Sequence, residues 1–446
     1  MTADFDWMLH PDAEALVDRI VGDAMAKSPR FACLSADLGP RTSTRVQDWL
    51  DVVGGPVFAD ELREVGYVDG HATTPGVWRH PGAQLPAVVI AEGYRIDLRV
   101  DDAAAFAHAQ RSTRAVEGSR RSGYRRAVVM DENDVEVGGV ERRSWSAGVT
   151  PQQFTVGQAA DAAEAERLLA ERPRALAGEN GVEAQIAFAR KAVSLAGPEL
   201  AAAYFLEIER TYWQRSNAAG TMQHARQDRL GLGWGNNDHH TFRSSRPAFN
   251  GLIRFLQALG FGLRERFYAG DEAGWGAQVL EHPGSGGVIF ADVDLTPDEV
   301  QLDFSQVELA ELSGGDAYGT VGMWCALHGE SLLGAGMHHL EGQFEFDGLR
   351  YQLAERGYAS MNPFSDFAHL RQAFTEAELW TVPRERLAPL VAAGHLSAER
   401  AEELATVGGA GSHLENLARR GGFKGFNQHN VSVTMKATHP RDYRPS

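Results

Sequence analysis

Residues 234–245 (WGNNDHHTFRSS) place two histidines and an arginine within a short run whose side chains could do chemistry. If the run is extended, its side chains alternate between two faces, so His239 and Arg243 share one face and His240 lies on the other. A neutral imidazole can bind a metal ion, and a guanidinium can bind a carboxylate. The alternative is a strand with hydrogen-bonded interior histidines, in which Arg243 forms a structural salt bridge with Asp238.

A second histidine run follows at residues 336–344 (GMHHLEGQF), where His339 and Glu341 would share a face. Each histidine run is followed by apolar residues at helical spacing, a glycine-aromatic stop and several extended runs. His239 and His339 therefore occupy matching places in a repeated βαβββ pattern. Because neighbouring strand residues point to opposite faces, the adjacent residues His240 and His338 are expected to face away from any metal.

Two paired βαβββ modules can set their first strands side by side, so that one histidine from each reaches a common centre. A carboxylate from a closing strand would complete a face of two histidines and one carboxylate, which leaves open positions for substrate and O₂ on Fe(II). We predict metal ligands at His239, His339 and Glu415. The alternative for Glu415 is a surface position on a helix, since LENLARR also looks helical. The other carboxylate candidates are Glu341, Glu378 and Glu385.

The expected fold class is α+β, with paired βαβββ modules, a helical connector and an N-terminal α+β module. We place the N-terminal module at residues 1–150, the connector at 151–232 and the metal-binding paired modules at 233–446. His-Pro-Gly stands between two β-like runs at both 76–90 and 279–290, which makes the N-terminal module a candidate degenerate βαβββ repeat. A coincidental Pro-Gly turn is the alternative.

Local sequence patterns predict the structure of two further segments. Residues 31–38 are expected to form a strand. The basic stretch at 110–126 is interpreted as a solvated loop and helix face rather than an anion-binding patch.

The overall composition narrows the classes of function. The chain has 446 residues, a formal net charge of −17 and 43% hydrophobic residues, so it is globular and its surface should repel nucleic acid and anionic membranes. Cys33 and Cys325 give no disulfide framework. No signal peptide or membrane span is evident at the N-terminus or elsewhere, so we expect a cytoplasmic protein.

The histidine motifs resemble those of a known enzyme group. DHHTFR is similar to the first metal-ligand strand of vicinal-oxygen-chelate dioxygenases, and His239 followed four residues later by Arg243 resembles the 2-oxoadipate dioxygenase/decarboxylase family. His339-Leu340 resembles part of that family's Asn-His-Leu-Thr strand, although His338 precedes it and Glu341 follows it here.

The third motif is looser. Glu415 with Arg419 resembles the Glu-x-x-x-Arg of that family and of 4-hydroxyphenylpyruvate dioxygenase, and residues 421–427 resemble the glycine-rich C-terminal segment of the latter. The resemblance covers roughly residues 234–446; the N-terminal half departs from both families.

The resemblance implies a non-haem Fe(II) dioxygenase/decarboxylase that uses O₂ and a 2-oxo acid, such as 2-oxoadipate giving 2-hydroxyglutarate and CO₂. As substrate-binding residues we expect Arg243, Val431 and Ser432, with Arg243 also catalytic. A buried Arg beside the metal suits a distal carboxylate, because its fork pairs a carboxylate bidentately. The expected partners are small molecules, with no nucleic acid or membrane; a homo-oligomer stays open.

Three other hypotheses remain. The chain could be an aryl-pyruvate dioxygenase whose pocket is lined by Phe423 and Phe426. It could be a metal-dependent isomerase or lyase of the same fold. It could also be a non-enzymatic binding protein with structural histidines.

Overall fold

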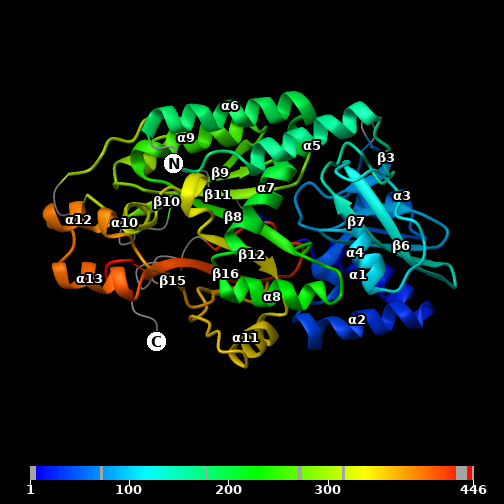
Figure 1. Cartoon of the computed structure of the whole chain (residues 1–446). Coiled ribbons are helices and arrows are strands. Elements are labelled where there is room, and N and C mark those ends of the chain that lie inside the picture. Colours follow the sequence, from blue (N-terminus) through cyan, green and yellow to red (C-terminus); the bar gives the residue numbers. More distant parts are fainter. Residues whose placement is uncertain are drawn as a thin grey trace.

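The computed structural model describes residues 7–70, 74–175, 178–268, 274–313, 317–427 and 439–443. Two β-sheets, one from each half of the chain, are joined by a group of helices (Figure 1). In the view of Figure 1 the N-terminal sheet lies to the right and the C-terminal sheet at the centre, with the long helices α5 and α6 along the top. The domain boundaries given above stay a prediction.

The N-terminal sheet has seven strands in the order β2-β3-β4-β1-β5-β7-β6. In its first unit, β1 is followed by helix α3 and three strands, and β1 pairs with β4 in parallel. In its second unit, β5 is followed by α4 and two strands, and β5 pairs with β7 in parallel. The first strands of the two units, β1 and β5, are antiparallel neighbours. The bounds are β1 Leu50–Gly55, α3 Ala59–Glu64, β2 Val68–Gly70, β3 Thr74–Arg79, β4 Ala87–Ile90, β5 Tyr94–Arg99, α4 Ala103–Ala109, β6 Tyr124–Glu132 and β7 Val135–Arg142.

The connecting region is helical, as its Ala- and Leu-rich pattern predicts. These helices share one hydrophobic core with the C-terminal sheet, because Phe205 of α7 packs on Phe242 of that sheet at a ring-centroid distance of 5.8 Å. The bounds are α5 Val156–Ala170, α6 Gly178–Ala196, α7 Pro198–Gln214 and α8 Ala218–Asp228.

The C-terminal sheet has nine strands, in the order β13-β14-β16-β12-β8-β11-β10-β9, with β15 paired to β16 beside this path. The first set of strands is β8 Asn237–Arg243, β9 Gly262–Tyr268, β10 Trp275–Glu281 and β11 Val288–Asp294, with helix α9 Arg246–Ala258. The second set is β12 His339–Gln343, β13 Ser365–Phe367, β14 Leu370–Phe374, β15 Glu378–Trp380 and β16 Gly409–Arg419, with helix α11 Phe346–Ala354.

These two sets are the predicted paired modules. In the first, β8 leads into α9 and pairs in parallel with β11; in the second, β12 leads into α11 and pairs in parallel with β16. β8 and β12 are antiparallel neighbours at the centre of the sheet. Each module helix ends at a glycine with positive φ, Gly260 (98°) and Gly357 (86°), which a residue with a side chain would rarely adopt. The predicted α+β fold with paired βαβββ modules is therefore confirmed.

Three more helices belong to the C-terminal half. Helix α10 (Thr320–His328) lies between the modules, and α12 (Arg384–Ala392) and α13 (Ala398–Thr406) are inserted between β15 and β16. Asp294, at the end of β11, accepts backbone N–H groups of Gly319, Val321 and Gly322, and so satisfies the amino end of α10.

The predicted strand at residues 31–38 is wrong, because this segment belongs to helix α2 (Pro29–Thr42), which follows α1 (Pro11–Lys27). The Ser28 side chain accepts the Phe31 backbone N–H, and Pro29 occupies the first turn, where its missing N–H costs little. Phe31, Leu34 and Leu38 are buried at helical spacing, a signal stronger than the local β propensity.

Glu415 lies on strand β16, so the helical alternative for LENLARR is wrong. Every residue of β16 is buried, since β12 lies on one side, β14 and β15 on the other, and helices pack against it. A strand buried on both faces shows no alternation of polar and apolar residues, which explains why its sequence resembles a helix.

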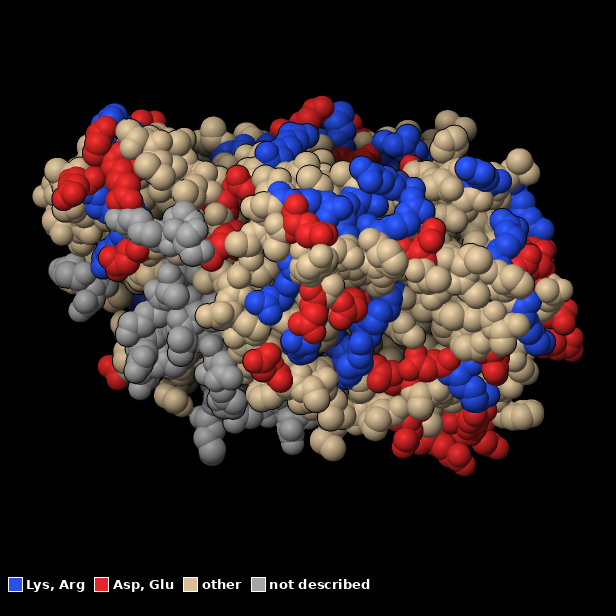
Figure 2. Space-filling model, turned by 90° about the horizontal axis from the view of Figure 1, so that it is seen from below, with Lys and Arg blue, Asp and Glu red and all other residues tan. Residues whose placement is uncertain are grey.

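The face of the molecule seen from below carries charges of both signs (Figure 2). Lys and Arg gather toward its middle with acidic side chains among them, and further acidic side chains gather at its lower right edge. Within the described residues, no helix is long and apolar enough to cross a membrane.

Candidate metal centre

The candidate centre is built on the three middle strands of the C-terminal sheet. His239 of β8 lies opposite Glu341 of β12, and Glu341 lies opposite Glu415 of β16. Residues paired across strands point to the same face. The three side chains therefore form one row, and His339, two residues before Glu341, lies on the same face.

The possible metal-ligand atoms of this row of side chains lie close together. His239, Glu341 and Glu415 each offer a ligand atom, and these atoms all lie within 4.8 Å of one another. The Oε1 atom of Glu341 is 2.8 Å from Nε2 of His339 and 3.3 Å from Nε2 of His239. The structure thus brings together His239, His339 and Glu415, and it places Glu341, the rival carboxylate candidate, between the two histidines.

Asp238 orients the His239 ring. Its Oδ1 is 2.9 Å from Nδ1 of His239, and Arg419 donates to both Asp238 oxygens at 2.9 Å. Gln84, from the N-terminal half, also donates to Asp238 at 2.8 Å. With Nδ1 donating to this carboxylate, Nε2 of His239 presents its lone pair to Glu341, which is the tautomer that binds a metal.

The electrostatics favour neutral groups in the absence of a cation. Burial lowers the pKa of His239 and lowers that of His339 further, with nearby positive groups adding to the shift at His339. Burial raises the pKa of Glu415 to about 8, and burial together with the charge of Glu415 raises the pKa of Glu341 well above its usual value. At Asp238 burial opposes ionisation, but the Arg419 charge and the His239 hydrogen bond outweigh it and lower the pKa.

The donor set fits a divalent metal. Oε2 of Glu341 is buried and has no hydrogen-bond partner among the described residues, while Oε1 accepts from the Thr241 hydroxyl at 2.8 Å. Gln372 donates to Oε1 of Glu415 at 2.8 Å, which holds that carboxylate in place. Imidazole nitrogens with carboxylate oxygens suit Fe(II), Mn(II) or Zn(II), and a cation would replace the protons that the buried carboxyls otherwise need.

A small aromatic cavity adjoins the donors. Its volume is about 50 Å³, enough for a metal ion and a bound water. The rings of Phe290 and Phe426 lie 4.7 and 4.9 Å from the His239 ring, and Phe374 lies 4.9 Å from the His339 ring. The other residues that line it include Thr241, Phe267, Trp275, Asp292, Phe364, Gln372 and Asn427.

Arg243 lies at the far end of β8, on the face that carries His239. It is buried, and its guanidinium carbon is 5.7 Å from the centre of the Trp324 ring. Burial lowers its pKa to about 10, and its charge helps to lower the pKa of His339. Burial raises the pKa of its cross-strand partner Asp292 to about 7 even beside this guanidinium. The hypothetical salt bridge from Arg243 to Asp238 is wrong, since Asp238 pairs with Arg419.

The remaining residues predicted as ligands or pocket walls lie in several different places. Glu378 accepts the Ala218 backbone N–H at the start of α8, and Glu385 is exposed on α12, so neither reaches the centre. Val431 and Ser432 lie outside the described residues. Of the two aromatic candidates, Phe426 lines the cavity, whereas Phe423 packs against His369.

His240 and His338, the histidines next to the two candidate ligands, have different surroundings. His240 faces the opposite side of β8, where Nδ1 is 3.2 Å from the Val288 carbonyl oxygen and Nε2 is 3.4 Å from Arg210. His338 contacts the other nitrogen of His339, with 2.6 Å between the two Nδ1 atoms, whereas Nε2 of His339 is the atom that reaches Glu341. That His338 faces away from a bound metal stays a prediction.

No family model and no curated protein sequence matches the chain. Among solved structures, a mutant 4-hydroxymandelate synthase from Streptomyces coelicolor is 13% identical with a TM-score of 0.31, covering 88% of this chain and 98% of that one. A methylmalonyl-CoA epimerase from Mycobacterium tuberculosis is 14% identical with a TM-score of 0.23, covering 41% and 87%. An uncharacterized Shigella flexneri protein, YdcJ, is 13% identical with a TM-score of 0.25, covering 57% and 73%.

The chain has a vicinal-oxygen-chelate-like fold. Its own strand order carries this assignment, with two βαβββ modules joined through antiparallel first strands. The narrower resemblance to the 2-oxoadipate family stays a prediction.

Sequence reasoning missed the supports of the centre. Asp238 stands next to His239, and an acidic residue beside a ligand histidine is a signal that could have indicated its orienting role. Gln372 and Gln84 carry no comparable signal, because they reach the centre only through the folding of distant segments.

The two histidines of β8 provide a matched test of the centre. His239→Ala should abolish stoichiometric Mn(II) binding, because it removes a donor, whereas His240→Ala should retain it, because that ring faces α7. Isothermal titration calorimetry on both variants measures this. Metal loss in His240→Ala with retention in His239→Ala would contradict the placement.

The buried carboxyl groups predict that stability of the metal-free protein and affinity for metal change in opposite directions with pH. The raised pKa of Glu415 stabilises the metal-free fold at low pH; this contribution is complete below about 4.3, the usual value for Glu, and is lost as pH rises through about 8. Metal affinity should instead rise over this window, because the metal displaces the proton. Thermal unfolding and Mn(II) titration from pH 5.5 to 8.5 measure both trends. Glu415→Gln should flatten the dependence of thermal stability on pH and weaken Mn(II) binding. If stability and Mn(II) affinity change with pH as in the unaltered protein, the assignment is contradicted.

Proposed function

We propose that the protein is an Fe(II)-dependent dioxygenase that decarboxylates and hydroxylates a 2-oxo acid, with a 2-oxo dicarboxylate such as 2-oxoadipate as substrate and 2-hydroxyglutarate and CO₂ as products. The observation that carries the proposal is the meeting of two imidazole Nε2 atoms at one carboxylate oxygen, on the joined first strands of paired βαβββ modules. A bound Fe(II) would supply a point for chelating the 2-oxo acid and for O₂ to react.

The residues of the chain divide the remaining work. His239, His339 and Glu415 would hold the metal, and Asp238 with Arg419 fixes the ring of His239. The aromatic walls keep water from the centre, which strengthens electrostatic interactions there. Arg243, on the same strand face as His239, would bind the distal carboxylate of the substrate, with Val431 and Ser432 as further proposed contacts.

The aromatic cavity also supports a different substrate for the same chemistry. Phe290, Phe374 and Phe426 surround the histidine rings, and such walls suit an aryl group. An aryl-pyruvate is therefore the alternative substrate, and it would not need the guanidinium of Arg243.

The position of Glu341 favours a second candidate function, that of a non-oxidative metal-dependent isomerase or lyase. Its carboxylate lies between the two histidines, so it can serve as a fourth protein ligand. Four protein ligands leave fewer open positions on the metal, which hinders simultaneous binding of a 2-oxo acid and O₂.

The test is O₂ consumption by protein loaded anaerobically with Fe(II) and mixed with 2-oxoadipate, 2-oxoglutarate, 2-oxobutyrate or 4-hydroxyphenylpyruvate. Equimolar O₂ consumption and CO₂ release with 2-oxoadipate is expected. Turnover of 4-hydroxyphenylpyruvate instead would favour the aryl substrate. Metal that stays bound without O₂ consumption for any acid would refute the dioxygenase and favour the non-oxidative candidate.

The variant Arg243→Lys tests whether Arg243 binds the distal carboxylate of the substrate. The variant should keep the metal but weaken 2-oxoadipate, seen as a rise in KM, by about 2 kcal/mol, because Lys cannot form the bidentate pair and a buried charged hydrogen bond is left unmade. The matched control substrate is 2-oxobutyrate, a monocarboxylate that should change much less. Equal losses for both substrates, or none, would mean that Arg243 does not bind that carboxylate.

A further inference from the structure

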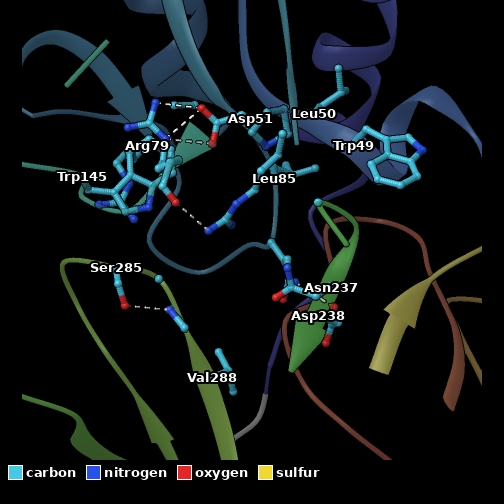
Figure 3. A pocket seen from close by; sticks show the side chains of 18 of the residues that line it. Trp49, Leu50, Asp51, Arg79, Leu85, Trp145, Asn237, Asp238, Ser285 and Val288 are labelled. Atoms are coloured by element: carbon cyan, nitrogen blue, oxygen red, sulfur yellow. Dashed lines mark hydrogen bonds and ion pairs between the residues drawn. The ribbon is translucent and has the colours of Figure 1, made fainter. Parts of the chain in front are cut away.

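The two loops that contain the His-Pro-Gly turns border a common cavity, which reaches Asp238 but is distinct from the aromatic cavity at the metal centre. The first turn joins β3 to β4 and the second joins β10 to β11, which are matching places in their βαβββ units. Residues of both turns line a cavity of about 530 Å³, shown in close-up with Leu85 from the N-terminal half and Ser285 and Val288 from the C-terminal half (Figure 3). No residue lines both this cavity and the one at the metal centre.

Two arginines in this cavity have no carboxylate partner within ion-pair distance among the described residues. Arg79, at the end of β3, is exposed and lies with its guanidinium carbon 4.3 Å from the centre of the Trp145 ring. Arg99, at the end of β5, is partly buried, and within the described residues its guanidinium makes one hydrogen bond, from Nη2 to the carbonyl oxygen of Arg142 at 3.4 Å.

Most carboxylates of the lining pair with other cations. Asp51 pairs with Arg142 at 2.8 Å, and Figure 3 shows Asp51 in the same part of the cavity as Arg79 and Trp145. The other lining carboxylates with ion pairs are Asp48 with Arg45, Glu141 and Glu207 with Arg143, Glu281 with Lys424, Asp101 with Arg210 and Asp238 with Arg419. Asp69 also lines the cavity and accepts the Gly76 backbone N–H. Arg79 and Arg99 are the lining cations that have no ion-pair partner among the described residues.

Both guanidiniums lie where their charged form is disfavoured. Loss of hydration lowers the pKa of each, and the positive charge of Arg142 lowers it further, although the nearby Asp51 acts in the opposite direction on both. Arginine nevertheless stays protonated in proteins. A bound anion would offset the repulsion and supply the acceptors that these donors lack.

We propose that the cavity between the two His-Pro-Gly turns binds a small organic anion, with its carboxylate or phosphate group held by Arg79 and Arg99. Guanidinium forks match the planar or tetrahedral oxygens of such groups. The Ser285 hydroxyl accepts the Gly287 backbone N–H at 3.4 Å and keeps its own proton for a ligand. This site lies beyond the proposed dioxygenase activity.

The dimensions and surroundings define the ligand class. A volume of about 530 Å³ lies within the range of small-molecule sites, about 300–1,000 Å³. Leu85, Val288 and Leu206 provide apolar wall for the body of the ligand. The net charge of −17 disfavours a polyanion such as nucleic acid, which would meet the whole surface rather than one cavity.

The experiment is isothermal titration calorimetry of the full chain with inorganic phosphate and, separately, with glutarate, which distinguishes a phosphate from a carboxylate ligand. We expect at least one probe to bind, with affinity about tenfold or more weaker in Arg79→Ala and in Arg99→Ala, because each loses charged hydrogen bonds. The matched control is Arg254→Ala, an exposed arginine of α9 paired with Glu183, whose affinity should equal that of the unaltered protein.

Thermal unfolding provides the second measurement. The binding probe should raise the Tm of the unaltered protein and of Arg254→Ala, and should not raise that of the Arg79→Ala/Arg99→Ala double variant, which also reports whether the variants fold. His239→Ala should bind the probe unchanged, which separates this site from the metal centre. No binding of either probe at millimolar concentration, or undiminished binding in the double variant, would overturn the proposal.

Discussion

The pairing of β8 with β12 is the constraint on which the candidate centre depends. It sets His239 opposite Glu341, and the parallel pairing of β12 with β16 extends the row to Glu415. A slip of one residue along either pair would turn a donor to the other face of the sheet. The hydrophobic core prevents the slip, because Phe242 and Leu340 fill the opposite face and are fully buried.

The same register also creates an electrostatic problem that the centre must solve. It places Glu341 and Glu415 side by side in an environment without bulk water, and a buried carboxylate is costly unless it is paired. The negative charge of Asp238 is neutralised by Arg419, which donates a hydrogen bond to each of its carboxylate oxygens. Glu341 and Glu415 have no arginine or lysine within ion-pair distance among the described residues, so protons or a metal ion must carry the compensating charge.

The sequence predicted those parts of the fold whose signals are local. The histidine strands, the amphipathic helices after them and the glycine stops at Gly260 and Gly357 are legible from residue spacing, and their repetition revealed the paired modules. Strand β16 could not be recognised, because burial of both faces erases alternation. The central place of Glu341 depends on which strands pair and in what register, and the Asp238–Arg419 pair joins residues that are 181 positions apart.

The N-terminal sheet repeats this architecture, and its described residues hold no cluster of possible metal ligands like that of the C-terminal sheet. Its first strands β1 and β5 are also antiparallel neighbours, and Asp97 lies buried on β5. There Arg95 and Arg126 neutralise the carboxylate with ion pairs of 2.7 Å each, and although burial opposes it, their charges lower the pKa of Asp97. The buried carboxylate of the N-terminal sheet is therefore always neutralised by arginine side chains of the protein itself. In the C-terminal centre the corresponding cations are missing among the described residues and neutral imidazoles take their place, so its buried carboxyls need either a proton or a bound cation.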